Sequence, residues 1–429
     1  MGVAQAWAAP DLNSAASLIS KHHIAHPTSQ QVPVSSSGEL QRFLSTLDPY
    51  SQWIDYPQYR ALTRPKSSLG LGAMVLEQPG GILMAPIKGG AVWQAGIQRA
   101  VFLTGIAGVS LQDKKIGYVA AQLQGRRDIA IRWRIPGQSK ERISAVKLGS
   151  FTIPTVELHP LTNHQSGVLI RIHSFLAHRT ALALQQALLK GLAFGGPIIL
   201  DLRYAPGGSV LEAVDAASLF LDEGLPIVTM VESDGTSIPL QSTAAMRVMP
   251  HPVVVLIGPG TASAAELFVR ALKFHGAAWV VGQGSFGKCL TQRYFQLPNG
   301  SGLKLTVGHL LGPDGVFCEH RGVQPHFIIR DSEQLHDTPV LLEGVMRDIK
   351  ASRLVCLAQR FNHAAQARRH VKRVGWHRGV GKLVPYALQQ SKKLWRLCLS
   401  PPLMSSVAEA VHKRQQQKSI ENMVLLPLP

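Results

Sequence analysis

The sequence predicts a layered α/β core in its middle part, where stretches typical of buried strands alternate with stretches typical of amphipathic helices. Residues 167–172 read GVLIRI and residues 253–257 read VVVLI, and both are short apolar runs of strand length. Apolar residues recur at helical spacing in 180–193 and 264–272. Such alternation is the pattern of βαβ units, which build layered α/β folds.

Length and composition agree with a globular protein of several domains. The chain has 429 residues, 45% of them hydrophobic and 16% charged, which is enough for two or three domains with buried cores. Lysine and arginine outnumber acidic residues 44 to 26, for a net charge of +18, and part of this excess lies near the C-terminus. A basic surface favours anionic partners, but no nucleic-acid motif accompanies it, so no specific nucleic-acid role is predicted.

The first 66 residues divide into two parts. Residues 1–38 carry little pattern and are interpreted as unstructured or as a signal remnant, since MGVAQAWAAP has the small residues of a cleavage site without the basic and apolar regions that precede one. Residues 39–66 are predicted to be a helical segment with a turn at 47–49, in which Asp48 and Ser51 serve as turn and cap residues. The sequence contains no run of about twenty apolar residues, so no membrane-spanning helix is predicted.

The four cysteines, Cys289, Cys318, Cys356 and Cys398, are far apart in the sequence. No Cys-x-x-Cys pair or histidine spacing typical of zinc accompanies them, so neither a metal nor another cofactor is predicted. Four well-separated cysteines in a large domain form no disulfide framework, so we expect free buried thiols. The cysteines therefore do not indicate whether the protein works in an oxidising or a reducing compartment.

The stretch 258–292 carries the candidate chemistry. Ser263 is predicted where a Gly-Pro-Gly turn enters a helix, a place with free backbone N–H groups. A serine there becomes a nucleophile if a base can take its proton, and Lys288 becomes such a base if burial beside residues such as Phe286 disfavours its charged form. Taken singly, Ser263 also fits an ordinary N-cap, Lys288 a surface charge and Gln292 a polar strand residue.

The same stretch resembles the carboxyl-terminal processing peptidases, or tail-specific proteases, a family of Ser-Lys serine peptidases. The matching segments are TASAAE, AAWVVG and SFGKC, followed by Gln292. The resemblance implies that Ser263 is the nucleophile, Lys288 the general base and Gln292 the residue that orients the lysine. Two positions depart from the family pattern: Ala265 stands in place of a serine, and Cys289 in place of a glycine.

Two further segments extend the resemblance over residues 39–330. DLRYAPGG matches the family's Asp-Leu-Arg-x-x-Pro-Gly-Gly, which implies an oxyanion hole from the N–H groups of Gly208 and Ala264, although a plain structural turn also fits the glycine pair. Residues 67–148 resemble a PDZ domain. The residues expected to hold a substrate's terminal carboxylate are Leu69, Gly70, Leu71 and Gly72.

The resemblance implies a crotonase-like peptidase core at 149–335 with the PDZ domain inserted ahead of it. It implies a serine endopeptidase that cleaves proteins with accessible C-termini near those termini through an acyl-enzyme, outside the cytoplasm in the periplasm or cell envelope. The leading alternative is an inactive relative that binds peptides as a scaffold, and acyl-CoA chemistry on the same core is a weaker one.

The C-terminal part lies outside the resemblance. Residues 336–360 are predicted to form a helix, because apolar residues recur there at helical spacing. Residues 361–429 are rich in basic residues and glutamine without a sustained period, and are predicted to be a poorly ordered tail. Such a tail would contact an adaptor protein or an anionic membrane surface.

Overall fold

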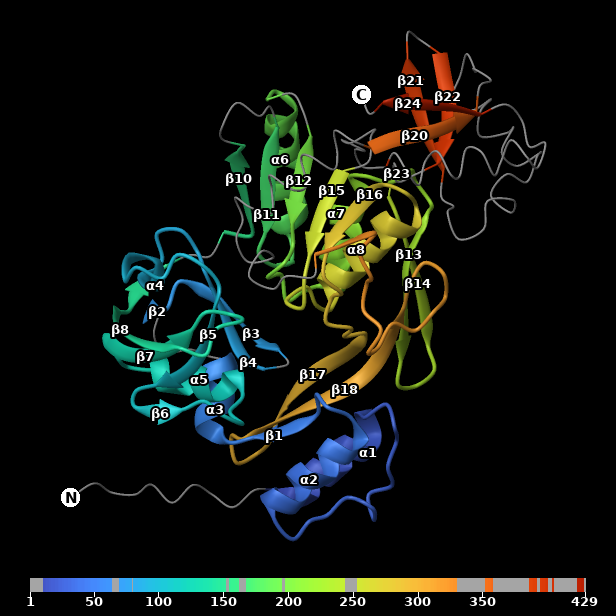
Figure 1. Ribbon diagram of the computed structural model, residues 1–429. Coiled ribbons are helices and arrows are strands. Elements are labelled where there is room, and N and C mark those ends of the chain that lie inside the picture. Colours follow the sequence, from blue (N-terminus) through green and yellow to red (C-terminus); the bar gives the residue numbers. More distant parts are fainter. Residues whose placement is uncertain are drawn as a thin grey trace.

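The structure is a computed structural model, and Figure 1 shows its parts following one another along the chain. The described residues are 11–63, 69–78, 80–151, 154–161, 167–194, 197–243 and 253–329, with five further strands nearer the C-terminus. None of the helices in these ranges has the length and apolar character needed to cross a membrane.

The N-terminal segment contains two helices that lie side by side, a short strand and a third helix (Figure 1). Their bounds are α1 Leu12–His22, α2 Ser37–Leu47, β1 Gln52–Ile54 and α3 Tyr56–Thr63. Helix α1 lies inside the range predicted to be unstructured, so that prediction is wrong for residues 12–22. The reason is tertiary: Ile19 of α1 and Leu40 of α2 are fully buried in a cluster with Leu303 and Leu305.

A β-rich domain follows. Its main sheet has the order β3-β4-β5-β7-β8, with β6 paired to β5, and a separate pair joins β2 to β9. The strands are β2 Leu69–Gly70, β3 Ala73–Gln78, β4 Gly81–Pro86, β5 Val101–Ile106, β6 Val109–Ser110, β7 Asp128–Arg134, β8 Glu141–Lys147 and β9 Gly149–Ser150. Helices α4 Ala91–Gln94 and α5 Ile116–Leu123 complete it. This domain has its own buried cluster, which includes Met84, Val101 and Ile131.

The α/β core is built on a six-stranded sheet of order β10-β11-β12-β15-β16-β19, parallel except for β10. The strands are β10 Val156–Pro160, β11 Val168–Ile172, β12 Ile198–Asp201, β15 Val253–Ile257, β16 Ala278–Gly282 and β19 Phe327–Ile328. The helices are α6 Thr180–Leu192, α7 Val210–Ser218 and α8 Ala264–Phe274. This alternation of parallel strands and helices is the mixed α/β fold expected from the sequence.

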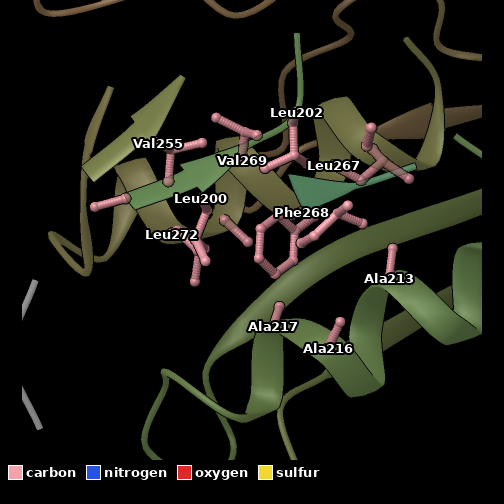
Figure 2. Packing of buried hydrophobic residues seen from close by; sticks show 14 of the residues in the cluster. Leu200, Leu202, Ala213, Ala216, Ala217, Val255, Leu267, Phe268, Val269 and Leu272 are labelled. Carbon is pink, nitrogen blue, oxygen red and sulfur yellow. The ribbon is translucent and has the colours of Figure 1, made fainter. Parts of the chain in front are cut away.

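The three core helices pack on one face of this sheet. Residues Leu200 and Val255 of the strands share a buried cluster with Phe268 of α8 and with the small residues of α7 (Figure 2). The neighbouring strand residues point to the other face, where Ile199 and Leu256 belong to a second cluster. Fully buried strands of this kind are apolar on both faces, which explains the continuous run at 253–257.

A second sheet lies beside the α/β sheet and carries part of the site. Its order is β1-β18-β13-β14, with β17 paired to β18. The bounds are β13 Pro226–Glu232, β14 Ser237–Gln241, β17 Leu290–Gln296 and β18 Gly302–Leu311. The antiparallel β17–β18 pair is a hairpin whose turn contains Asn299 and Gly300, residue types that favour such turns.

The C-terminal strands correct two predictions. Their bounds are β20 Ser352–Leu357, β21 Tyr386–Ser391, β22 Leu394–Leu399, β23 Leu403–Met404 and β24 Met423–Pro427, and they form one sheet. The helix predicted over 336–360 is therefore wrong at residues 352–357, and the tail at 361–429 contains four strands. Pairing between segments distant in the sequence, such as β20 with β24, leaves no local periodicity from which to predict it. The rest of both ranges lies outside the described residues.

Candidate active site

Ser263 occupies a sharp turn between β15 and α8. Its φ is +55°, a left-handed conformation that a non-glycine residue adopts rarely, and it is the N-cap residue of α8. Two contacts hold the turn against the loop that follows β12: the Thr261 hydroxyl donates to the Leu202 carbonyl at 2.7 Å, and the Ala262 N–H donates to the Ala205 carbonyl at 3.0 Å. The serine is thus presented on a rigid turn at the positive end of a helix.

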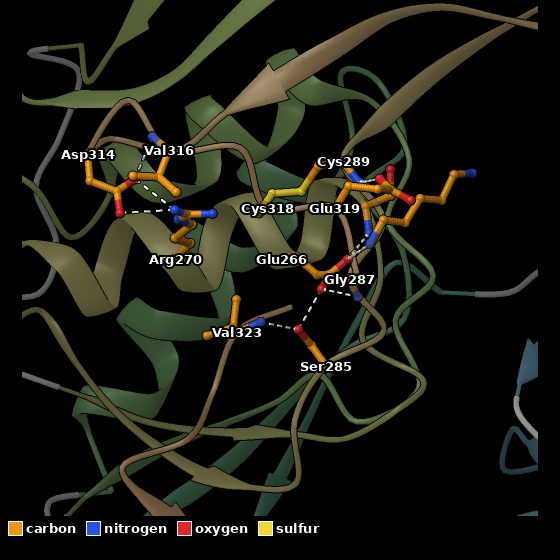
Figure 3. The surroundings of a disulfide bond; sticks show 12 residues. Glu266, Arg270, Ser285, Gly287, Cys289, Asp314, Val316, Cys318, Glu319 and Val323 are labelled. Carbon is orange, nitrogen blue, oxygen red and sulfur yellow. Dashed lines mark hydrogen bonds and ion pairs between the residues drawn. A yellow bond between two sulfur atoms is a disulfide. The ribbon is translucent and has the colours of Figure 1, made fainter. Parts of the chain in front are cut away.

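Glu266, one turn into α8, joins the Ser263 turn to the segment that carries Lys288. Its side chain is buried, and its Oε2 accepts the N–H of Ser263 at 2.9 Å and that of Lys288 at 2.8 Å. Its Oε1 accepts the Gly287 N–H at 2.7 Å and the Ser285 hydroxyl at 2.5 Å (Figure 3). Burial raises the pKa of the Glu266 carboxyl group, and the hydrogen bonds that it accepts offset only part of this increase. Sequence reasoning missed this role, although Ser-x-x-Glu at a helix start is the pattern of a capping box.

Lys288 lies two residues before β17, and its Nζ lies 5.0 Å from the centre of the Tyr50 ring. Burial, and to a smaller extent the nearby Lys304, lower the pKa of Lys288 from 10.5 to about 8, although Glu319, Glu77 and Glu266 oppose the shift. A substantial fraction of uncharged amine is therefore present close to neutral pH, as a general base requires.

The structure brings the backbones of Ser263 and Lys288 together, but the described hydrogen bonds include none between Ser263 Oγ and Lys288 Nζ. Gln292 lies on β17, where its side-chain amide donates to the Leu290 carbonyl at 3.0 Å. The catalytic roles of these three residues remain predictions.

The glycine pair after β12 lies directly against the serine turn. Gly207 has φ +97° and Gly208 has φ +142°, and a Cβ on Gly207 would come within 2.7 Å of the Ala264 nitrogen. The neighbouring Gly207 carbonyl and Ser209 N–H both bond to the backbone of Phe175. Among the hydrogen bonds of the described residues, the N–H groups of Gly208 and Ala264 have no acceptor, so they are free to bind an oxyanion. Their role in an oxyanion hole remains a prediction.

A buried ion-pair cluster supports the base of this loop. The Arg203 guanidinium donates from Nε and Nη2 to the two carboxylate oxygens of Asp201, at 2.8 and 2.7 Å, and Arg171 adds a contact at 3.1 Å. Although burial opposes ionisation, the two arginines hold the pKa of Asp201 well below its usual range. The ion pair between Asp201 and Arg203 therefore holds the base of the loop.

Cys289 and Cys318 form a disulfide (Figure 3), so the expectation of free thiols is wrong for this pair. The two cysteines are 29 residues apart in sequence, and the fold brings them together because the segment after β18 returns to the start of β17. There the Leu310 N–H donates to the Cys289 carbonyl, and the His320 N–H donates to the Gly287 carbonyl. Such pairing cannot be deduced from spacing alone.

The residues expected to bind a substrate carboxylate lie in the β-rich domain, away from the serine turn (Figure 1). Leu69 and Gly70 form β2, while the carbonyls of Leu71 and Gly72 accept the N–H groups of Val92 and Ile87. Their role in carboxylate binding remains a prediction. In the described ranges, no group of three or more histidine, cysteine or acidic residues is placed to hold a metal ion.

Comparison with known proteins adds an independent observation. The family model for Peptidase family S41 matches residues 168–329. A probable CtpA-like serine protease of Staphylococcus haemolyticus is 31% identical over 283 residues, which cover 65% of this chain and 56% of that protein. The corresponding protein of Staphylococcus aureus is 30% identical over 287 residues, which cover 66% of this chain and 57% of the relative. This chain therefore spans a little over half the length of these relatives.

Solved structures show the same fold at lower identity. A photosystem II D1 C-terminal processing protease matches with a TM-score of 0.60 at 23% identity, over 78% of this chain and 95% of that one. A putative S41 protease from Bacteroides fragilis matches with a TM-score of 0.51 at 15% identity, over 76% and 92%. The chain has the mixed α/β fold of these proteases, and its residues 168–329 match the model for Peptidase family S41.

Proposed function

We propose that the protein is a serine endopeptidase of the C-terminal processing type, in which Ser263 is the nucleophile and Lys288 the general base. The observation that carries this proposal is the Glu266 carboxylate, whose Oε2 holds the backbone N–H groups of both residues. The mechanism needs the side chains of Ser263 and Lys288 for proton transfer. Oε2 of Glu266 fixes the two backbone segments that carry them. The lowered pKa of Lys288 supports the same assignment.

The reaction follows from these positions. Uncharged Lys288 Nζ takes the proton of Ser263 Oγ, which attacks the peptide carbonyl, and the N–H groups of Gly208 and Ala264 donate to the oxyanion. The lysine then gives its proton to the leaving amine, and water hydrolyses the acyl-enzyme by the same steps. For this transfer the amine has to leave the face of the Tyr50 ring and meet the serine hydroxyl. We assign to Gln292 the role of orienting the amine there, which requires its side chain to leave the Leu290 carbonyl.

We further propose that the core is crotonase-like and that the β-rich domain is a PDZ domain that binds the C-terminal tail of a protein substrate. Among the described strands, β3 pairs only with β4, so its other edge is open to a peptide added as a strand. The segment of Leu69, Gly70, Leu71 and Gly72, whose first two residues form β2, leads directly into β3, which suits it to hold the terminal carboxylate.

The proposed location is outside the cytoplasm, in the periplasm or cell envelope. The Cys289–Cys318 disulfide supports this proposal, because disulfides persist mainly in oxidising compartments. The basic C-terminal residues would contact an adaptor protein or an anionic membrane surface there, and no nucleic-acid partner is proposed.

Hydrolysis of casein and of a peptide with an apolar C-terminus tests the proposal, in wild type and in the Ser263→Ala and Lys288→Ala variants. A fluorophosphonate probe should label wild type at Ser263 and leave Ser263→Ala unlabelled. We expect both variants to lose activity by at least about a thousandfold. The second candidate is an inactive scaffold that binds peptides, because the described hydrogen bonds include none between the side chains of Ser263 and Lys288. A wild-type protein that binds tail peptides but neither hydrolyses them nor reacts with the probe would establish this candidate.

A further inference from the structure

A set of contacts around Lys288 connects its side chain to the disulfide that the next residue, Cys289, forms with Cys318. The ring of Tyr50 lies beneath Lys288 Nζ, and the Tyr50 hydroxyl donates to Glu319 Oε1 at 2.7 Å. The other carboxylate oxygen of Glu319 accepts the Cys289 N–H at 2.6 Å. Cys289 follows Lys288 in the chain, and its disulfide partner Cys318 precedes Glu319 (Figure 3). The contacts therefore close a ring that begins and ends at the proposed base.

We propose that Tyr50 and Glu319 are positioning residues for Lys288, and that the Cys289–Cys318 disulfide keeps them in place, so that its reduction lowers the peptidase activity. This inference rests on the proposed function and deepens it by a regulation of the same site. Tyr50 and Glu319 act through Lys288 and need not touch the substrate.

The lysine side chain needs such support. Its amine takes part in no hydrogen bond or ion pair among the described residues, and its four-carbon stem is flexible. The ring of Tyr50 gives the charged amine a defined resting place through a cation–π contact, from which the amine moves to the serine hydroxyl once it has lost its proton. Tyr50 itself is fixed, since its N–H donates to Asp48 Oδ1 at 2.7 Å and Asp48 also accepts the Thr306 hydroxyl at 2.9 Å.

The disulfide is placed to control this support. Both cysteines are buried, and the bond joins the residue after Lys288 to the residue before Glu319. A dithiol reductant supplies two electrons and two protons: the Sγ–Sγ bond breaks, two thiols form, and the dithiol is oxidised to its own disulfide. Two unbonded sulfur atoms cannot stay about 2.05 Å apart, as they are in a disulfide, so the two segments must separate. That separation shifts Glu319 away from the Cys289 N–H and the Tyr50 hydroxyl.

The charges that face Lys288 make the proposal measurable by pH. They come from several elements: Lys304 of β18, Glu77 of β3, Glu266 of α8 and Glu319 of the loop after β18, with the uncharged Tyr50 ring between them. Glu319 favours the charged amine, so its replacement by glutamine lets the amine lose its proton at lower pH. A residue that only stabilised the fold would leave the midpoint of the pH profile in place.

The experiment measures kcat, KM and the pH profile of the full chain on a tail peptide. We expect Glu319→Gln to move the midpoint of activity to lower pH. We expect Tyr50→Leu to lower kcat about tenfold with KM unchanged, and Tyr50→Phe, which keeps the ring but loses the hydrogen bond to Glu319, to have a kcat between those of Tyr50→Leu and wild type. Circular dichroism spectra confirm that each variant is folded.

The redox part compares the protein before and after dithiothreitol, with a thiol count to confirm reduction. We expect kcat to fall about tenfold and to return on reoxidation. Cys289→Ala/Cys318→Ala should have the low kcat in both conditions, while Cys356→Ser/Cys398→Ser should respond as wild type does. This inference is overturned, and the proposed function stands, if the protein is active, reduction leaves its kcat unchanged and Glu319→Gln leaves the midpoint of its pH profile unchanged. A wild type that neither hydrolyses the peptide nor labels at Ser263 overturns the proposed function with it.

Discussion

The backbone N–H groups of Ser263 and Lys288 donate to the same oxygen atom, Oε2 of Glu266. The first residue begins helix α8 and the second precedes strand β17, so one carboxylate ties the turn of the proposed nucleophile to the segment of the proposed base. A displacement of either segment must break a hydrogen bond to a buried charge, which is costly. The relative position of the two segments is therefore set by Glu266 before any substrate binds.

Replacing Glu266 should damage both stability and activity. Glu266→Ala leaves several buried backbone N–H groups without an acceptor, and each such group costs about 1–3 kcal/mol. We expect the free energy of unfolding to fall by about 3 kcal/mol or more and peptide hydrolysis to be lost. Urea denaturation and the peptide assay measure both, with the exposed Glu223→Gln as a matched control that should stay within about 0.5 kcal/mol of wild type. An active Glu266→Ala protein of wild-type stability would contradict the role given to this residue.

The pH profile should show the titration of Lys288. Because only the uncharged amine can accept the serine proton, activity is low below the pKa of Lys288 and high above it. Burial lowers this pKa to about 8, so kcat/KM should rise with pH through a midpoint near 8, and not near 10.5. A midpoint near that of a free lysine would show that the amine is solvated in the working enzyme.

Gly207→Ala should disable the site through a steric clash. A Cβ at this position would lie 2.9 Å from the Cβ of Ser263 and 2.7 Å from the Ala264 nitrogen, so the turn and the proposed oxyanion donor must move. Loss of one oxyanion donor costs about 100- to 1000-fold in kcat, and we expect a decrease of that size. Gly224→Ala is the matched control, because Gly224 also has a positive φ, of +76°, but its added Cβ meets nothing within 4 Å. That variant should keep wild-type kcat, with only the small loss of stability that its backbone conformation causes.

Reduction of the disulfide should also destabilise the fold. In the chain-entropy description, a cross-link between residues 29 apart stabilises a protein by about 3–4 kcal/mol. We expect this decrease in the free energy of unfolding for Cys289→Ala/Cys318→Ala, measured by urea denaturation without reductant. The single Cys289→Ala variant should lose about as much, because either replacement removes the bond. Equal urea midpoints for wild type with and without dithiothreitol would contradict the expectation.

The sequence predicts the local features of this protein much better than its long-range contacts. The strand at 253–257, the helix that follows Ser263 and the β17–β18 hairpin follow from periodicity and turn residues, and the structure contains all three. Asp48 was expected to be a turn residue, and its carboxylate does accept the N–H groups of Tyr50 and Ser51.

The features that escaped prediction depend on partners far away in the chain. Glu266 bonds to residues about twenty positions later, and Cys289 pairs with a cysteine that only the folded hairpin brings near. Strand β20 replaced part of a predicted helix because its neighbours in the sheet come from the last residues of the chain. Nor did the turn prediction at residues 47–49 indicate that Tyr50 would lie under Lys288. No local pattern contains this information.

Asp48 should make the stability of the protein sensitive to acid. Burial would raise the pKa of its carboxyl group, but hydrogen bonds from His23, Ser51, the Tyr50 N–H and Thr306 lower it from 3.8 to about 2. An acid with a lower pKa in the folded state contributes stability above its unfolded pKa and loses that contribution as the pH falls toward the folded value. The contribution should therefore be complete above about pH 5, decrease between about pH 4 and pH 2, and amount to about 2 kcal/mol. Urea denaturation of wild type and Asp48→Asn at pH 6 and pH 3 measures it: the difference between the two proteins should shrink at the lower pH. A difference between Asp48→Asn and wild type that is the same at both pH values would show that the hydrogen bonds of Asp48 do not act through its ionisation.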